Sequence, residues 1–266
     1  MRPGPKPNPF LEAMTSGGVR KGFWLSLGSA GVAEVAAGAG FDFVVLDSEH
    51  SPVEAAGILA QMRVLDSLGV HPVVRPVWKD AHILKKFLDI GAQTLLIPYV
   101  ETAEEMRAVV AATRYPPEGV RGVSMAHRSN AWGRDAGYFD RAAGQLCLIP
   151  QIETRKGMRN LDEILAVDGV GAVFVGPADL SADLGHPGKP GHPDLVAALR
   201  RIAEACTRAG MGWGTLVADA AQARERFEMG AAFVAAGTDS GAIRVVTDAA
   251  MAALSGIDDR RAMTGR

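Results

Sequence analysis

Short apolar runs recur along the chain, and longer segments with helical spacing separate each run from the next. Continuous apolar runs are typical of strands in a parallel sheet, because helices cover such a sheet on both faces. The predicted strands are Phe23–Leu27, Phe43–Leu46, Pro72–Arg75, Thr94–Ile97, Leu146–Ile152, Ala172–Val175, Trp213–Val217 and Ala232–Ala235.

The segments between these runs carry helix start and stop signals. Thr102–Glu105 and Asp219–Gln222 both have the capping-box pattern, and Gly230 is the usual kind of residue to end the second helix. Apolar residues three and four apart indicate further helices. These are predicted over residues 10–16, 83–88 and 193–209.

Alternation of strand and helix over 266 residues predicts an α/β fold, a single (β/α)₈ TIM barrel, whose usual length is about 250 residues. We assign residues 10–255 to the barrel, 1–9 to an irregular Pro-rich arm and 256–266 to a flexible C-terminal tail. The Tyr115–Ala143 insert breaks the rhythm, and we expect it on the catalytic face, since long loops are usually functional. A doubly wound sheet is the alternative, but its glycine-rich phosphate loop should follow a strand, whereas Gly38-Ala39-Gly40 precedes one.

The composition of the chain argues against two classes of partner, nucleic acids and membranes. The net charge is −2 with mixed signs, which argues against a nucleic-acid partner. No run approaches the roughly 18 apolar residues of a membrane span, and the first residues lack a signal peptide's apolar core. We therefore expect a cytoplasmic protein without a membrane partner, and we expect Cys147 and Cys206 to be small core residues.

Two predicted strands end on carboxylates. Glu153 closely follows one, with Gln151 on the same side, and Asp179 follows the next. The carboxyl ends of barrel strands assemble the site, so these groups should converge, and hard oxygen ligands suit Mg²⁺ or Mn²⁺ better than zinc. Alternatively, Glu153 caps the following helix and Asp179 begins a turn.

Other strand ends add candidate chemistry. Asp47, Glu49 and His50 follow the second strand, and Arg75 ends the third. Arg75 suits an oxyanion, His50 moves protons near neutral pH, and Asp47 can orient His50 or accept from a metal-bound water. The alternatives are a helix cap at Asp47, an ion pair between Asp47 and Arg75, and a turn at His50.

Five further residues are weaker candidates. Asp89 ends a predicted helix, where a negative charge opposes the macrodipole, so it is either simply exposed or partners a histidine. His127 and Arg128, in the insert, could contact a polar end of the substrate. Trp24 and Leu216 lie in or at the ends of predicted strands and are candidate substrate contacts.

Several segments together resemble the HpcH/HpaI family of metal-dependent class II pyruvate aldolases, from about Asn8 to about Val246. The resemblance implies a barrel of the phosphoenolpyruvate/pyruvate type, a C-terminal helix exchanged between subunits, and a homo-hexamer. It also implies cleavage of 4-hydroxy-2-keto acids to pyruvate and an aldehyde through a metal-stabilised pyruvate enolate. The segments are VVLDSEHSPV (44–53), PVVRP (72–76), KKFLDIGAQTLLIP (85–98), TRYPPEGVRGV (113–123), QIET (151–154) and VFVGPADLSADLGH (173–186).

The same resemblance implies residue roles. Glu153 and Asp179 match ligands of a divalent ion, expected to be Mg²⁺, Mn²⁺ or Co²⁺. Arg75 matches the arginine beside the enolate oxygen, His50 the acid/base histidine, and Asp89 the aspartate that supports this histidine from a neighbouring subunit. Asp47 and Gln151 match positions around the metal's water ligands and pyruvate, and the resemblance implies that Gly176, Pro177 and Ala178 supply backbone contacts to the pyruvate carboxylate.

The insert suggests a branch of the family. Its sequence RGVSMAHRSNAWG, residues 121–133, resembles the branch that acts on keto-deoxy-glucarate, which implies tartronate semialdehyde as the aldehyde, with His127 and Arg128 near its acid end. Two alternatives remain: a citryl- or malyl-CoA-type lyase, although no strongly basic stretch indicates a site for coenzyme A, and a non-catalytic keto-acid-binding barrel.

Overall fold

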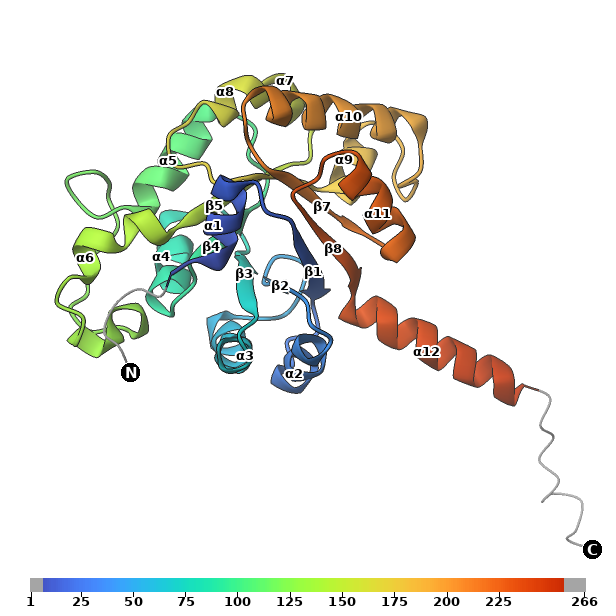
Figure 1. Ribbon diagram of the computed structural model, residues 1–266, viewed down its shortest axis with the longest axis horizontal. Helices are drawn as coiled ribbons and strands as arrows, with labels where there is room; N and C mark the ends of the chain where they lie inside the picture. The colour runs from blue at the N-terminus through green and yellow to red at the C-terminus, as the bar shows by residue number, and fades with distance from the viewer. Residues whose placement is uncertain (1–6, 256–266) are drawn as a thin grey trace, which may run out of the picture.

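The computed structural model describes residues 7–255 and contains a closed barrel of eight parallel strands that pair in chain order. Figure 1 shows helices arranged around it. The strands are β1 Arg20–Leu25, β2 Phe43–Asp47, β3 His71–Arg75, β4 Thr94–Ile97, β5 Cys147–Ile152, β6 Val173–Val175, β7 Trp213–Val217 and β8 Phe233–Thr238. The predicted (β/α)₈ barrel is confirmed, with β1 starting and ending earlier than expected and β8 extending further.

Most of the longer helices begin where a side-chain oxygen accepts a backbone N–H, as at Ser29, Thr102 and Asp219. The helices are α1 Pro9–Ser16, α2 Ala30–Gly38, α3 Ala55–Leu68, α4 Ala81–Asp89, α5 Ala103–Thr113, α6 Tyr138–Arg141, α7 Arg155–Arg159, α8 Leu161–Leu165, α9 Pro177–Asp183, α10 Pro193–Arg208, α11 Ala220–Glu228 and α12 Asp239–Leu254, with 3₁₀ turns η1 Arg128–Gly133 and η2 Ala143–Gln145.

The N-terminal segment closes the amino end of the barrel. Asn8 caps α1, accepting the N–H groups of Phe10 and Leu11 at 3.0 Å, while its amide donates to Thr94 Oγ1 at 3.1 Å. The Phe10 ring packs edge-on against Phe43 with centroids 5.3 Å apart. The expected arm therefore ends before Pro9, which already belongs to α1. Residues 1–6 of that arm and the expected tail, 256–266, lie outside the described residues.

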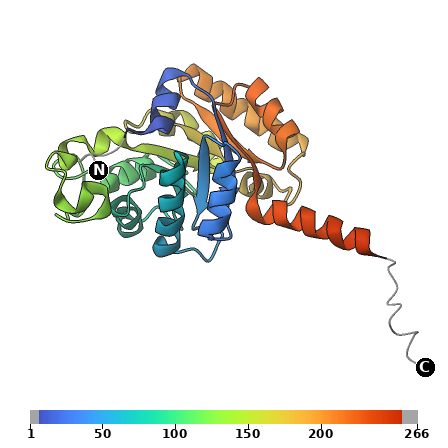
Figure 2. The same ribbon diagram turned by 60° about the horizontal axis from the view of Figure 1, so that its bottom comes forward.

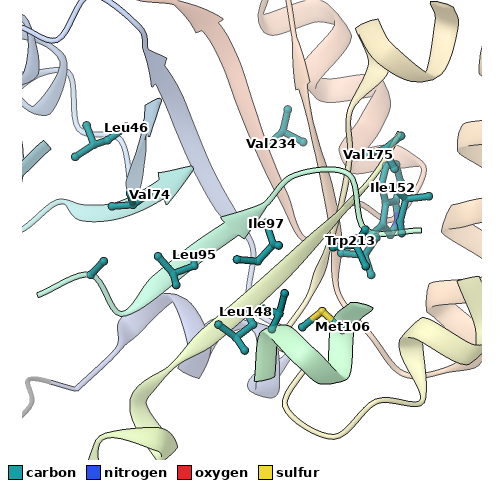
Figure 3. Packing of buried hydrophobic residues seen from close by; sticks show 14 of the residues in the cluster. Leu46, Val74, Leu95, Ile97, Met106, Leu148, Ile152, Val175, Trp213 and Val234 are labelled. Carbon is teal, nitrogen blue, oxygen red and sulfur yellow. The ribbon is translucent and has the colours of Figure 1, made fainter. Parts of the chain in front are cut away.

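Strand residues alternate between two apolar clusters. One lies inside the barrel and contains Cys147 among its members; the other lies between the sheet and its helices and contains Cys206. Both thiols are free and buried, as predicted. Figure 3 shows part of the outer cluster, which includes Leu95 of β4, Leu148 of β5 and Met106 of α5. Burial on both faces explains the continuous apolar runs in the sequence.

The insert between α5 and β5 lies at the amino end of the barrel, so the prediction that it lies on the catalytic face is wrong. It joins the end of a helix to the start of a strand, and such connections occupy the end opposite the carboxyl ends of the strands. Its contacts agree: Arg128 Nη1 donates to Ile90 O at 2.9 Å, and Ser129 Oγ donates to Leu88 O, both at the end of α4.

Helix α12 projects away from the barrel in both views (Figures 1 and 2). Its first residue, Asp239, is buried and accepts the N–H groups of Ser26 and Leu27. The rest of the helix is largely exposed, including Val246 at 67% and Met251 at 65%. Beyond its first residue, this helix is therefore largely uncovered by the rest of residues 7–255 as it leaves the barrel. Within residues 7–255, no helix has both the length and the apolar content needed to cross a membrane.

Candidate active site

A buried ion-pair network lies at the carboxyl ends of β1, β2 and β3. Arg75 donates from Nε to Asp47 Oδ1 at 2.9 Å and from Nη2 to Asp47 Oδ2 at 2.7 Å. Its Nη1 lies 2.8 Å from Glu49 Oε2, and its guanidinium carbon lies 4.6 Å from the centre of the Trp24 ring. Two carboxylates and an aromatic face therefore hold this positive charge in one position.

The alternative role of Arg75 as an ion-pair partner of Asp47 is thus present in the structure. Asp47 also accepts Trp24 Nε1 at 3.3 Å and the N–H of Glu49 at 2.9 Å. Burial alone would raise the pKa of Asp47, but the hydrogen bonds and charge of Arg75 outweigh it and hold the pKa below its usual value. Asp47 is therefore a charged anchor for the arginine.

Glu153 and Asp179 meet at a single residue, Tyr99, in the loop after β4. The N–H of Tyr99 donates to Glu153 Oε1 at 2.7 Å, and its hydroxyl donates to Asp179 Oδ1 at 2.8 Å. Gln151 Nε2 holds the other oxygen of Glu153 at 2.6 Å. The two carboxylates converge from the end of β5 and the first turn of α9, and their role as metal ligands stays a prediction.

The alternative role of Glu153 as a helix cap does not hold, because Thr154 caps α7 through its own hydroxyl. Gly176, just after β6, lies against Glu153: a methyl group on Gly176 would come within 2.3 Å of Glu153 Oε2. Only glycine therefore lets the backbone approach this carboxylate so closely.

Negative charges crowd together at this edge of the barrel. The pKa of Glu153 is raised to about 7, mainly by burial and also by the charges of Glu49 and Asp179, against hydrogen bonds from Tyr99 and Gln151 that lower it. Burial likewise raises the pKa of Glu49 to about 7, with Arg75 opposing the shift. A divalent cation would relieve this repulsion, and Gln151 Oε1 is buried without a hydrogen-bond partner. The donor set is all oxygen, so it fits Mg²⁺ or Mn²⁺.

The remaining candidates at this edge have fewer contacts. His50 is exposed on the turn after β2, and its N–H lies 3.4 Å from Asp47 Oδ1. Leu216, in β7, is half-buried beside the interior cluster. Pro177 is half-buried and Ala178 exposed at the start of α9.

Three candidates lie at the opposite end of the barrel from this site. Asp89 ends α4 and pairs with Arg121 Nη2 at 2.7 Å. His127 is buried against the ring of Tyr138, with centroids 5.2 Å apart, and burial lowers its pKa. Arg128 pairs with Asp66 at 2.5 Å. Within one chain, these residues therefore cannot contact the groups around Glu153.

Comparison with known proteins matches residues 20–245 to the family model described as HpcH/HpaI aldolase/citrate lyase. The chain belongs to the HpcH/HpaI family. A 4-hydroxy-2-oxo-heptane-1,7-dioate aldolase from Klebsiella pneumoniae is 46% identical over 88% of this chain and 88% of its own. An HpcH/HpaI aldolase/citrate lyase family protein from Burkholderia cenocepacia superposes with a TM-score of 0.89 at 34% identity, covering 93% of this chain and 99% of its own. An HpcH/HpaI aldolase from Desulfitobacterium hafniense gives 0.84 at 31% identity, with coverage of 92% and 95%.

Two residues of this candidate site in the HpcH/HpaI chain were not assigned a role from sequence. Glu49 follows Asp47 by two positions at a strand end, so its placement was a usable signal. Tyr99 carried no such signal, since its contacts depend on a left-handed backbone with φ of 51° and on β5 and α9.

The fold also brings His186 and His192, in the loop before α10, together with Asp194 in the first turn of that helix. His186 Nε2 lies 2.7 Å from Asp194 Oδ2, and the two imidazole rings stack with centroids 3.4 Å apart. His192 Nδ1 accepts the N–H of Asp194 at 3.2 Å and so caps α10. Sequence spacing did not indicate this grouping. Its contacts brace the loop that leads from α9 to α10.

Proposed function

We propose that the protein is a divalent-metal-dependent class II aldolase that reversibly cleaves 4-hydroxy-2-keto acids to pyruvate and an aldehyde. The observation that carries the proposal is the convergence of Glu153 and Asp179 on Tyr99, beside a fixed Arg75. Family membership supports it, because HpcH/HpaI proteins include aldolases that act on such keto acids.

Glu153 and Asp179 would hold the divalent ion, which we propose to be Mg²⁺, Mn²⁺ or Co²⁺. When bound, the ion supplies Lewis-acid stabilisation of negative charge on the keto acid. Gln151 orients Glu153 by donating to its Oε2. Gly176, Pro177 and Ala178 would bring backbone groups to the keto-acid carboxylate.

Arg75 would stabilise the oxygen on which negative charge develops. Its side chain is buried and is held by Asp47 and Glu49, so no reorientation is required during the reaction. Fixed positive charge in a poorly hydrated site lowers the barrier, and loss of one such donor typically costs about 100-fold or more in turnover. Trp24 and Leu216 would line the apolar side of the same space.

We propose that His50 transfers the proton of the substrate hydroxyl, with Asp89 of a neighbouring subunit as its support. Asp89 lies at the other end of its own barrel, so this pairing requires a second copy. The Asp89 side chain is only partly covered there, with 25% of it accessible, so a second copy could reach it.

We also propose a homo-hexamer in which subunits exchange α12. The rest of the described chain, residues 7–255, leaves the apolar side chains of this helix largely exposed, and Val35 on α2 is 78% exposed. A helix from another copy would cover such surfaces and bury apolar area on both. We propose a cytoplasmic location, with which two unpaired buried thiols agree.

The name of a relative and the sequence of the insert support two different aldehydes. Cleavage of 4-hydroxy-2-oxo-heptane-1,7-dioate between its third and fourth carbons leaves pyruvate and succinate semialdehyde. The Klebsiella pneumoniae relative is named for that substrate, whereas the insert suggested tartronate semialdehyde. Both aldehydes end in a carboxylate, and we propose that His127 and Arg128 of a neighbouring subunit lie near it.

A lyase that acts on citryl- or malyl-CoA is the second candidate, because the family description also includes citrate lyase. The experiment that separates the two measures pyruvate release from 4-hydroxy-2-oxo-heptane-1,7-dioate with Mg²⁺, and acetyl-CoA release from CoA thioesters in parallel. We expect pyruvate release that chelator and Glu153→Gln both abolish. Release that persists in chelator, or release from the thioesters alone, would contradict the proposal.

A further inference from the structure

Tyr99 is held by a separate contact at each of its polar groups and at its ring. Its N–H and hydroxyl reach Glu153 and Asp179, as described above. Its carbonyl oxygen accepts Lys79 Nζ at 2.5 Å, and its ring lies against Trp78 with centroids 5.9 Å apart. Lys79 is in turn held by Glu105 at 3.3 Å. The surroundings thus determine both the position and the orientation of Tyr99.

The backbone of Tyr99 is strained. Its φ of 51° lies in the left-handed region, which is unfavourable for a residue with a side chain and which glycine adopts freely. Favourable contacts of the tyrosine side chain therefore have to offset the unfavourable conformation of its backbone. The hydroxyl of this side chain donates its hydrogen bond to Asp179.

The two hydrogen-bond donors of Tyr99 each contact one oxygen of a different carboxylate. The hydroxyl occupies Asp179 Oδ1, which leaves Oδ2 as the oxygen without a contact from Tyr99. The N–H occupies Glu153 Oε1, and Gln151 occupies Oε2. Rotation of either carboxylate would break a hydrogen bond to the same residue, so Tyr99 couples the orientations of both.

We propose that Tyr99 is a positioning residue that sets the geometry of the two metal-ligand carboxylates, with its hydroxyl orienting Asp179 and its N–H orienting Glu153. This inference rests on the proposed function, since it assigns Glu153 and Asp179 to the metal. Hydrogen-bond partners of metal ligands typically account for about 10- to 100-fold in metal affinity, because an unrestrained ligand must be ordered when the ion binds.

The test is Tyr99→Phe, which keeps the ring against Trp78 and the N–H to Glu153 and removes only the hydroxyl. The matched control is Tyr115→Phe. The Tyr115 hydroxyl is buried without a hydrogen-bond partner, in the insert at the amino end of the barrel. Mn²⁺ binding to each full-length protein is measured by calorimetry without keto acid, together with the melting temperature in chelator and pyruvate release as a function of Mn²⁺ concentration.

We expect Tyr99→Phe to bind Mn²⁺ about tenfold more weakly than wild type, whereas Tyr115→Phe binds it with unchanged affinity. Saturating Mn²⁺ should restore the turnover of Tyr99→Phe, because an orienting group matters least once the ion is bound. Wild-type affinity in Tyr99→Phe would overturn the inference. Turnover that stays low at saturating Mn²⁺ would also overturn it, since the hydroxyl would then act on the substrate. Absence of Mn²⁺ binding to the wild type would instead overturn the proposed function.

Discussion

Replacing Glu153 by glutamine removes one charge from the place where the carboxylates crowd together. Glu153 is 2% exposed, and burial raises its pKa from 4.5 to about 7, with the charges of Glu49 and Asp179 adding to the shift. In the unfolded chain the group has its ordinary pKa. The folded, metal-free protein therefore binds this proton more tightly than the unfolded chain does, and ionisation of Glu153 destabilises the fold.

The direction and size of this effect on stability follow from the linkage between proton binding and folding. A raised carboxyl pKa contributes stability that is fully present below about pH 4.5 and is lost as the pH rises through about 7. The shift from 4.5 to about 7 corresponds to about 3 kcal/mol. Glutamine resembles the protonated acid. We therefore expect the free energy of unfolding of Glu153→Gln to exceed that of the wild type by about 3 kcal/mol at pH 8 and by less than about 1 kcal/mol at pH 5.

The assay is urea unfolding in chelator at both pH values. The matched control is Glu118→Gln at an exposed position, which should change the free energy by less than about 0.5 kcal/mol. Adding Mg²⁺ should stabilise the wild type and leave Glu153→Gln unchanged, because binding to the folded state alone adds stability. A variant less stable than wild type at pH 8, or a difference of equal size at both pH values, would refute the reasoning.

Three further predictions test other parts of the structure. Arg75→Lys should lower the free energy of unfolding by about 3 kcal/mol, because one ammonium cannot replace a guanidinium paired with two buried carboxylates. It should also lower the rate of pyruvate release about 100-fold, and a wild-type rate would contradict the role proposed for Arg75. Burial lowers the pKa of His71 to about 4, so stability is present above about pH 6.5 and lost as the pH falls through about 4. In urea unfolding, the free energy of unfolding of the wild type should fall by about 3 kcal/mol more than that of His71→Gln between about pH 6.5 and pH 4. Parallel pH profiles of the two proteins would contradict this prediction. Gly176→Ala should weaken Mg²⁺ binding at least about tenfold by displacing Glu153, whereas Gly144→Ala, which meets no atom within 4 Å, should leave calorimetric affinity unchanged.

Local patterns in the sequence were sufficient for the fold. Buried parallel strands require continuous apolar runs, and helix starts require side-chain acceptors, so both leave short-range signals. Strand ends were equally informative, because a barrel brings all its carboxyl ends to one face. For this reason Glu153 and Asp179 could be expected to converge without knowledge of any contact between them.

The position of the insert was predicted wrongly, although chain order contains the answer. Length alone suggested a functional loop on the catalytic face. A segment that leads from a helix into a strand lies at the amino end, and the contacts of Arg128 with the end of α4 agree with this. His127 and Asp89 share that end, so neither can reach His50 of the same chain.

By itself, the sequence determined the order of elements, the buried faces and the carboxylates at the strand ends, because each depends on neighbours in the chain. Only the tertiary structure decided the contacts between groups far apart in sequence. These include the pairing of Arg75 with both Asp47 and Glu49, the contacts that hold Tyr99 in a left-handed conformation, and the departure of α12 from its own barrel (Figure 1). Each depends on packing between separate strands and helices, which no short stretch of sequence specifies.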